Sequence, residues 1–337
     1  MSHLVAAPDK FRGTADASQV AAAAARGARR AGWSASELPL ADGGDGLLAA
    51  VGGEVRRDRV TGPLGAPVLA EWRIVEGTAA RNGPTAVIEM ARASGLVLAG
   101  GPAHNQALAA STVGTGQLVL RAIAEGATRI VVGCGGSATT DGGAGALQAI
   151  GSVEALRNVE LLAASDVTTK FLDAATVFAP QKGATVPQVA ELAGRLANLA
   201  ERYRDEFGVD VTDLPGAGAA GGLAGGLAAL GARIVSGFDL VADLVGLDAK
   251  LAGADLVMTG EGTLDRQSFA GKVVGGVVER VGARVPILCV VGAVAPGTGP
   301  QPFELVSLVA CFGSRRARTE VLALIEEVVA AHVAARG

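Results

Sequence analysis

Few residues of the sequence are aromatic, cysteine or histidine. Aromatic residues make up 3% of the 337 residues, and there are three histidines and three cysteines. The histidines lie near the N-terminus, in a loop and in the final helical segment, so neither a histidine metal site nor a Ser-His-Asp triad is expected. The cysteines lie in apolar, strand-like runs without metal-ligand spacing, which predicts reduced core residues. They are Cys134, Cys289 and Cys311.

Long hydrophobic segments and basic clusters are also lacking. Apolar runs end after about ten residues at a proline or glycine, well short of the roughly 20 residues of a membrane-spanning helix. No basic leader precedes the first apolar run, and Asp9 follows it closely, so a signal peptide is not indicated. The net charge is −4, and no basic cluster interleaved with aromatic residues indicates nucleic-acid binding. We therefore expect a cytoplasmic protein that binds small molecules.

The hydrophobic pattern predicts an α/β fold with two domains, as expected for a chain of this length. Apolar strand-like runs alternate with helix-like segments at both ends of the chain, and their continuous apolar character is typical of buried parallel strands. Residues 1–61 and 236–337 are predicted to form one discontinuous, flavodoxin-like, doubly wound parallel sheet with strand order 2-1-3-4-5.

Residues 62–235 are predicted to form a second, inserted α/β domain. Its strands are expected at residues 85–91, 129–136 and 174–180. Ligand sites favour strand ends and domain junctions, so the active site is expected in the cleft between the two domains.

The strongest local signal is GCGGSATTDGGAG, which follows a predicted strand and precedes a predicted helix. Backbone N–H groups in such a turn can approach an anion, and the helix N-terminus adds partial positive charge. The candidate anion-binding residues are Gly135, Gly136, Ser137 and Thr139. The alternative is a tight connection in which Asp141 caps the helix. The spacing matches neither a dinucleotide fingerprint nor a Walker A motif.

Two loops near the N-terminus carry charged residues after predicted strands. In APDKFRGT, Asp9, Lys10 and Arg12 suit a polyanion held together with its metal, but a surface salt-bridge cluster has the same pattern. In PLADGGDG, Asp42 is a candidate base or metal-facing carboxylate, and the alternative is an ordinary acidic turn.

Two later loops have a similar character. Lys182 in APQKGAT lies in a turn after a predicted strand, which suits a cation that meets a phosphate. In TGEGTLDRQSFAGK, Glu261 and Asp265 follow a buried strand and offer the oxygen ligands that magnesium prefers, and Lys272 is a candidate phosphate contact. Solvated loops are the alternative in both cases.

Together, these motifs resemble the glycerate kinases of the bacterial type I family. The matching stretches are APDKFRG, PLADGGDG, VTGPLGAPV, VIEMARASGL, GCGGSATTDGGAGALQAIG, VFAPQKGA, GAGAAGGL and ADLVMTGEGTLDRQSFAGK, in the family's order over almost the whole chain. The resemblance implies two α/β domains, ATP and Mg²⁺ as cofactors, and transfer of the γ-phosphoryl group to D-glycerate. The 2-hydroxyl is the usual acceptor, so the products would be 2-phosphoglycerate and ADP.

Phosphoryl transfer needs an in-line acceptor hydroxyl and neutralised phosphate oxygens. For this reaction, either Asp42 or Asp141 is predicted to orient and deprotonate the acceptor hydroxyl. Arg12 and Lys182 are predicted to neutralise phosphoryl or carboxylate oxygens. The predicted magnesium ligands are Glu261, Asp265 and Asp166.

The sequence departs from the family pattern in several places. The first loop has Lys10 and Arg12 where the family usually has serine and lysine, and the segment near residues 152–172 looks shortened. There, AASDVTTKFL keeps Asp166 but loses the family's Asn-Pro turn. A related hydroxy acid or the 3-hydroxyl is therefore an alternative acceptor, and a non-catalytic hydroxy-acid-binding module is a further alternative. We expect a monomer or a homodimer.

Overall fold

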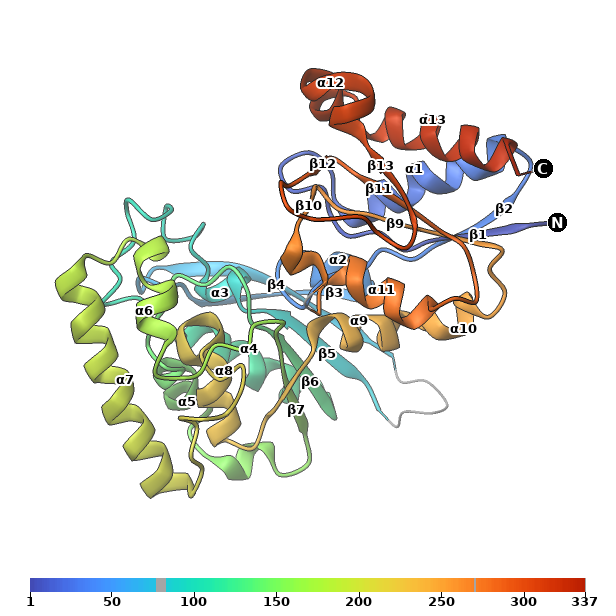
Figure 1. Cartoon of the computed structure of the whole chain (residues 1–337). Coiled ribbons are helices and arrows are strands. Elements are labelled where there is room, and N and C mark those ends of the chain that lie inside the picture. Colours follow the sequence, from blue (N-terminus) through green and yellow to red (C-terminus); the bar gives the residue numbers. More distant parts are fainter. Residues whose placement is uncertain (77–82, 270, 337) are drawn as a thin grey trace. The chain divides into compact units, whose positions relative to one another are not determined.

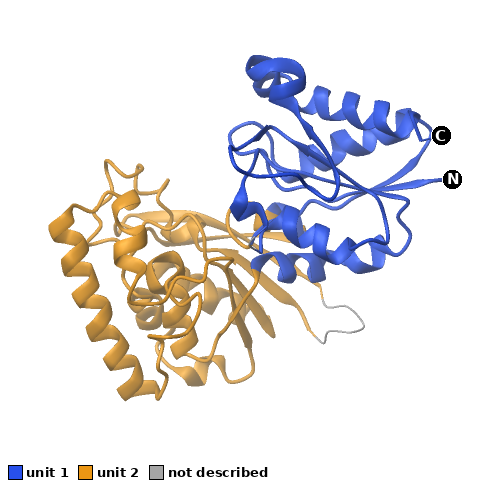
Figure 2. Ribbon diagram, viewed as in Figure 1, with its two compact units in different colours: residues 1–42, 49–51, 237–337 blue, residues 43–48, 52–236 orange. Residues whose placement is uncertain are grey.

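The chain forms two compact units, in a computed structural model that describes residues 1–76, 83–269 and 271–336 (Figures 1 and 2). Unit 1 comprises residues 1–42, 49–51 and 237–337, and unit 2 comprises residues 43–48 and 52–236. Helix α2 (Leu47–Val51) is divided between them. No helix in the described part of the chain is long and apolar enough to cross a membrane.

A five-stranded sheet forms the centre of unit 1. All of its neighbouring strands are parallel, and their order is β13-β11-β9-β1-β2. Numbered along the chain, this is the order 2-1-3-4-5, so the predicted flavodoxin-like sheet is confirmed. The strands are β1 (His3–Ala6), β2 (Ser34–Glu37), β9 (Leu256–Thr259), β11 (Ile287–Val291) and β13 (Glu304–Ser307). Two short strands, β10 (Thr263–Leu264) and β12 (Ala293–Val294), pair separately.

Helices cover both faces of this sheet (Figure 1). Helices α1 and α13 lie on one side, and their close approach depends on Gly27, where a Cβ atom would be 2.4 Å from the carbonyl oxygen of Glu326. The Asp16 side chain caps α1 by accepting a hydrogen bond from the backbone of Gln19. The helices are α1 (Ala17–Arg30), α9 (Gly237–Val245), α10 (Leu247–Leu251), η3 (Arg266–Phe269), α11 (Val273–Val281), α12 (Leu308–Thr319) and α13 (Val321–Ala334).

A six-stranded mixed sheet forms the centre of unit 2, in the order β3-β4-β5-β6-β7-β8. Strands β5 to β8 are parallel, whereas β3, β4 and β5 pair antiparallel. The second unit begins earlier than the predicted residue 62, because β3 pairs with β4 along its whole length. The strands are β3 (Glu54–Thr61), β4 (Pro67–Val75), β5 (Thr85–Glu89), β6 (Arg129–Gly133), β7 (Glu160–Ala164) and β8 (Arg233–Val235).

Helices of unit 2 pack on this sheet around a core that includes Trp72, Phe171 and Tyr203. The predicted strand at 174–180 is wrong, because residues 174–178 form a helix whose two alanines are buried and Pro180 begins a short 3-10 helix. A short apolar run does not distinguish a strand from a buried helical turn. The helices are α3 (Ala91–Ser94), α4 (Val113–Ala124), α5 (Ala144–Ile150), η1 (Val153–Leu156), α6 (Ala174–Phe178), η2 (Pro180–Lys182), α7 (Val186–Phe207) and α8 (Ala219–Ala229).

Two of the three cysteines are core residues. Cys134 and Cys289 are buried, as predicted, but Cys311 is exposed on α12. The apolar run around Cys311 consists of a short edge strand followed by a surface helix, so the prediction of a buried strand was wrong there.

Candidate active site

A cavity of about 930 Å³ opens in unit 1 at the carboxyl ends of its central strands. It is lined by the loops that follow β1, β2, β9 and β11 and by α12. The winding of the sheet reverses between β1 and β9, and doubly wound folds bind ligands at such a point. Seven predicted site residues line this cavity: Asp9, Lys10, Arg12, Asp42, Glu261, Asp265 and Lys272.

Glycines allow the loops of this cavity to pack closely. A Cβ atom at Gly260 would lie 1.8 Å from the carbonyl oxygen of Val290, and one at Gly292 would lie 2.4 Å from that of Gly262. The loops are joined by hydrogen bonds from the backbone N–H of Asp9 to Gly260 and from that of Gly292 to Glu261. The glycines of TGEG therefore let the loop after β9 approach the loops after β1 and β11 closely.

Two carboxyl groups in the cavity have raised pKa values. Burial raises the pKa of Asp9 to about 6, against the opposing effect of Lys10, and the nearby charge of Asp42 adds to the rise. Burial raises the pKa of Glu261 to about 7, and the charge of Asp9 adds to it. The Oε1 atom of Glu261 is buried and has no hydrogen-bond partner within the described residues. Two carboxyl groups that repel each other fit a bound cation.

The other predicted residues of this cavity contact neighbouring side chains or cap a turn. The Asp265 carboxylate accepts hydrogen bonds from the backbone N–H groups of Gln267 and Ser268, so it caps the turn η3. The Lys10 ammonium lies 3.9 Å from the Asp42 carboxylate. The Lys272 ammonium is 3.5 Å from the side-chain oxygen of Gln267. Ala270 of the same loop lies outside the described residues.

Two basic residues of the cavity were not predicted. Arg315 and Arg318 line it from α12. The available signal was the basic stretch SRRAR at residues 314–318, but it does not show which arginines face the strand ends.

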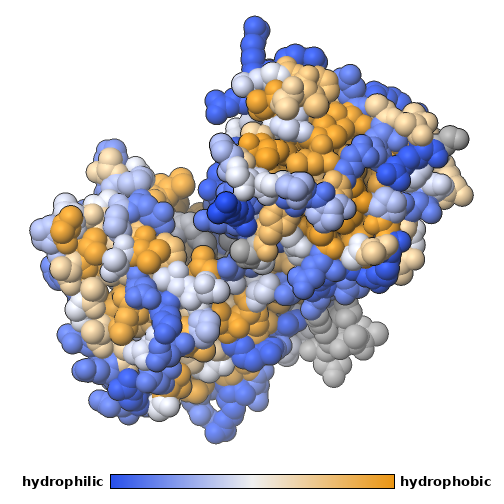
Figure 3. All heavy atoms as spheres, in the orientation of Figure 1, coloured by the Kyte–Doolittle hydropathy of each residue, from blue (hydrophilic) through white to orange (hydrophobic). Residues whose placement is uncertain are grey.

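In the same unit, hydrophobic residues reach the surface around β10 and β12, and hydrophilic residues surround them (Figure 3).

The predicted glycine-rich loop joins β6 to α5 in unit 2. Gly136 and Gly143 have φ values of 66° and 83°, which glycine adopts without strain. The side chains of Ser137 and Thr139 are buried and turned inward, where the Lys182 ammonium donates hydrogen bonds to the Ser137 hydroxyl (2.7 Å) and the Thr139 carbonyl (2.6 Å). The backbone at Gly135 and Gly136 is the more accessible part of the loop.

Asp141 anchors the end of this loop. Its Oδ2 atom accepts hydrogen bonds from the backbone N–H and hydroxyl of Thr112, both 2.8 Å, and from the N–H of Gly145 at 3.2 Å. Oδ1 accepts from the N–H of Gly143 at 3.2 Å. An orienting role toward an acceptor hydroxyl would therefore compete with four existing bonds.

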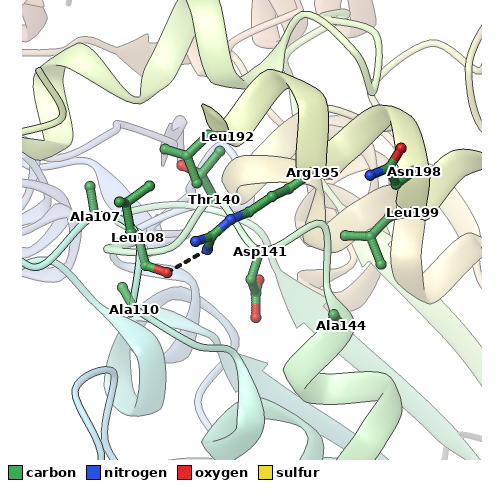
Figure 4. Close-up of a pocket in the computed structure, with 10 residues that line it drawn as sticks. All are labelled: Ala107, Leu108, Ala110, Thr140, Asp141, Ala144, Leu192, Arg195, Asn198 and Leu199. Atoms are coloured by element: carbon green, nitrogen blue, oxygen red, sulfur yellow. Dashed lines mark hydrogen bonds between the residues drawn. The ribbon is translucent and has the colours of Figure 1, made fainter. Parts of the chain in front are cut away.

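Asp141 also borders a separate cavity of about 320 Å³ in unit 2 (Figure 4). Alanine and leucine side chains form most of its wall, and Arg195 reaches across it from α7 to donate a 2.7 Å hydrogen bond to the carbonyl of Leu108. This bond ties α7 to the loop before α4 and occupies part of the guanidinium.

Lys182 is only 4% exposed, and this burial lowers its pKa to about 7, although the charge of Asp141 opposes the shift. A neutral amine keeps two N–H groups, enough for both of its hydrogen bonds. The structure thus gives Lys182 the role of holding the glycine-rich loop.

This burial predicts a pH dependence of stability. Between about pH 7 and the ordinary lysine pKa, the unfolded chain binds a proton that the folded chain does not, so stability rises with pH. Relative to Lys182→Met, the wild type should gain about 1.4 kcal/mol per pH unit in this range. Urea unfolding of both proteins between pH 7 and 9.5 measures this difference in unfolding free energy. A difference that stays constant with pH would show that the amine remains charged.

A second group of polar residues lies at the carboxyl ends of β5 and β6 in unit 2. The buried Glu89 carboxylate accepts hydrogen bonds from the N–H groups of Gly46 (2.9 Å) and Leu48 (3.1 Å) and from Arg92 (3.0 Å). A Cβ atom at Gly136 would be 2.8 Å from the Asp45 carboxylate. Glu89 and Arg92 were not predicted as site residues, although both lie in VIEMARASGL, one of the stretches that carry the family resemblance.

The predicted magnesium ligands belong to different units. Glu261 and Asp265 lie in unit 1, and Asp166 follows β7 in unit 2. Within the described residues, no three histidine, cysteine, aspartate or glutamate side chains form a preformed metal cluster. Asp9, Asp42 and Glu261 line the same cavity and carry oxygen atoms of the kind that a hard divalent cation binds.

Comparison with known proteins identifies the class of this protein. The chain is 40% identical over 313 residues to the glycerate 2-kinase of Escherichia coli K12, covering 81% of this chain and 80% of the relative. It is 37% identical over 336 residues to the glycerate kinase of Halalkalibacterium halodurans, covering 88% and 87%. A crystal structure of a Salmonella typhimurium LT2 protein, provisionally named glycerate kinase 2, matches with a TM-score of 0.80 at 33% identity, covering 99% of both chains.

The protein is therefore a kinase, and the predicted fold of two α/β domains is confirmed. The model of the glycerate kinase family matches residues 4–154 and 151–331. The chain belongs to the glycerate kinase family, as the motifs indicate. The family match divides at residues 151–154, next to the segment that the sequence predicts to be shortened.

Proposed function

We propose that this protein transfers the γ-phosphoryl group of ATP to the 2-hydroxyl of D-glycerate, which gives 2-phosphoglycerate and ADP. The observation that carries the proposal is the cavity of unit 1, where buried carboxyl groups and basic side chains line the same strand ends. This combination suits a polyphosphate bound together with a divalent cation. The name of the Escherichia coli relative supports the 2-hydroxyl as acceptor.

In this proposal, Glu261 and Asp9 hold Mg²⁺, with Asp42 beside them. The ion would neutralise charge on the phosphate oxygens. Arg12, Lys10 and Lys272 would bind the same phosphates, since all three line the cavity. Asp42 is the better candidate than Asp141 for orienting the acceptor hydroxyl, because Asp141 already accepts four hydrogen bonds within its loop.

The polar group of unit 2 is a candidate acceptor site. Arg92 is half exposed, and the backbone of Gly135 and Gly136 is accessible. An arginine beside accessible backbone N–H groups suits the carboxylate of a hydroxy acid. That the reaction takes place where the two units meet stays a prediction.

The test is ADP release from ATP with D-glycerate and Mg²⁺, coupled to enolase. A signal with enolase alone is expected, because enolase consumes 2-phosphoglycerate directly. A signal that requires added phosphoglycerate mutase would move the acceptor to the 3-hydroxyl. ADP release with another short hydroxy acid, but not with glycerate, would change the substrate. Binding of glycerate without ADP release would favour the non-catalytic alternative.

A further inference from the structure

The last turns of α12 bring two arginines to the cavity of unit 1. Arg315 and Arg318 line this cavity together with Val309, Ser314 and Ala317 of the same helix. None of these residues is part of the strand-end loops that carry the predicted site. The helix thus adds a basic wall to a cavity whose other walls come from the loops after β1, β2, β9 and β11.

The position of this basic wall follows from the local sequence. The Ser307 side chain caps the start of α12, and Gly313 interrupts the helix with φ 80° and ψ 155°, a conformation that only glycine adopts without strain. After this kink, Ala317 is buried in the core of unit 1. Arg315 and Arg318 are three residues apart and so project from neighbouring positions on the helix surface.

Arg316, between them, behaves differently. Its guanidinium lies 2.9 Å from the Glu320 carboxylate and 5.6 Å from the centre of the Phe312 ring. Within the described residues, by contrast, no carboxylate lies within ion-pair distance of Arg315 or Arg318. Two like charges three residues apart on a helix disfavour each other unless an anion lies between them. Arg315 and Arg318 therefore lack a counter-charge like the one that Glu320 gives to Arg316.

The charge balance of the cavity indicates what that anion is. Four acidic side chains line the cavity, together with three basic ones from the loops. Without the helix, acidic side chains would outnumber basic ones in the lining by one. Arg315 and Arg318 reverse this balance, and a guanidinium binds phosphate oxygens through a fixed fork of N–H groups.

We propose that Arg315 and Arg318 form a phosphate-binding pair that holds the polyphosphate chain of the nucleotide in the cavity of unit 1. This inference rests on the proposed function, because it takes ATP as the nucleotide. The pair contacts the phosphates in the ground state and in the transition state alike. Its loss therefore raises the KM for ATP and leaves kcat and the KM for glycerate nearly unchanged.

The experiment compares the full-length wild type with the double variant Arg315→Gln/Arg318→Gln. Titration calorimetry with ATP, and with inorganic tripolyphosphate as a probe without a base, measures binding in the absence of acceptor. We expect the dissociation constant of the double variant to rise about 100-fold for both ligands, because two charged contacts are lost. The salt dependence of binding should also become weaker.

Arg316→Gln is the control for position, because it removes one arginine charge from the same helix but outside the cavity lining. It should bind ATP and tripolyphosphate as the wild type does. Equal affinities of the double variant and the wild type would overturn the inference, as would an equal loss in Arg316→Gln. A wild type that binds tripolyphosphate through this pair but releases no ADP would instead overturn the proposed function and leave the phosphate-binding pair standing.

Discussion

Replacing Glu261 with glutamine should lower the rate of phosphoryl transfer by roughly 100-fold and make the metal-free protein more stable above pH 7. The two effects have one cause. The Glu261 carboxyl is buried at the strand ends, and its Oε1 atom has no hydrogen-bond partner among the described residues. Such a group is unfavourable in the empty protein, but it is suited to hold a divalent cation beside the phosphates.

The sign of the stability effect follows from the raised pKa. The folded protein holds the Glu261 proton up to about pH 7, whereas the unfolded chain releases it near the ordinary pKa of 4.5. Stability from this group is therefore fully present below pH 4.5 and is lost as pH rises through 7. The loss is about 3 kcal/mol for a shift of this size. Glutamine keeps the shape of the side chain but cannot ionise, so the variant avoids the loss.

Two measurements test this prediction. Steady-state rates with ATP and glycerate give the loss of activity, and urea unfolding in EDTA at pH 6 and pH 8.5 gives the change in stability. Glu279→Gln is the matched control, because Glu279 is exposed on α11 of the same unit. It should change neither quantity. A Glu261→Gln variant that stays active, or that is less stable than the wild type at pH 8.5, would contradict a cation-binding role.

The sheet of unit 1 could be predicted because its strands carry their own signal. Four of its five strands are apolar runs that end at glycine, proline or a polar turn, and this pattern is typical of parallel strands covered on both faces. The antiparallel strands β3 and β4 lack that signal, because charged residues interrupt the apolar ones along both of them. At 174–180 an apolar signal is present, but the predicted strand is wrong. An apolar segment of this length also fits a buried helical turn.

The candidate site likewise has one part that the sequence predicts and another part that it does not. Asp9 and Glu261 follow strands that are neighbours in the sheet, so their approach follows from the topology alone. The basic pair Arg315 and Arg318 lies on a helix surface, and which of its arginines face the cavity depends on a kink at Gly313 that composition does not reveal. Lys182 has the expected residue type in the expected loop, but burial turns it onto the glycine-rich loop itself. Residue type and strand position predict which groups gather, whereas burial decides what each one contacts.

Replacing Gly221 with alanine should destabilise the protein by about 3 kcal/mol and reduce activity in proportion to the displacement of the glycine-rich loop. Gly221 has φ 70°, and its neighbours Ala220 and Gly222 also have left-handed backbone. A Cβ atom at Gly221 would lie 2.0 Å from the carbonyl oxygen of Thr139, the same oxygen that accepts the Lys182 hydrogen bond. The methyl group cannot fit unless the loop moves, since the obstacle is backbone rather than a flexible side chain.

The control is Gly194→Ala on α7, where no atom lies within 4 Å of an added Cβ. This substitution should raise stability by roughly 0.5 to 1 kcal/mol, because alanine favours a helix interior over glycine. Urea unfolding and steady-state rates of both variants separate the two effects. If Gly221→Ala were as stable and as active as Gly194→Ala, the contact between this glycine and the Thr139 carbonyl would not hold the loop. A stable but slow Gly221→Ala variant would show that the loop position matters to the reaction more than to the fold.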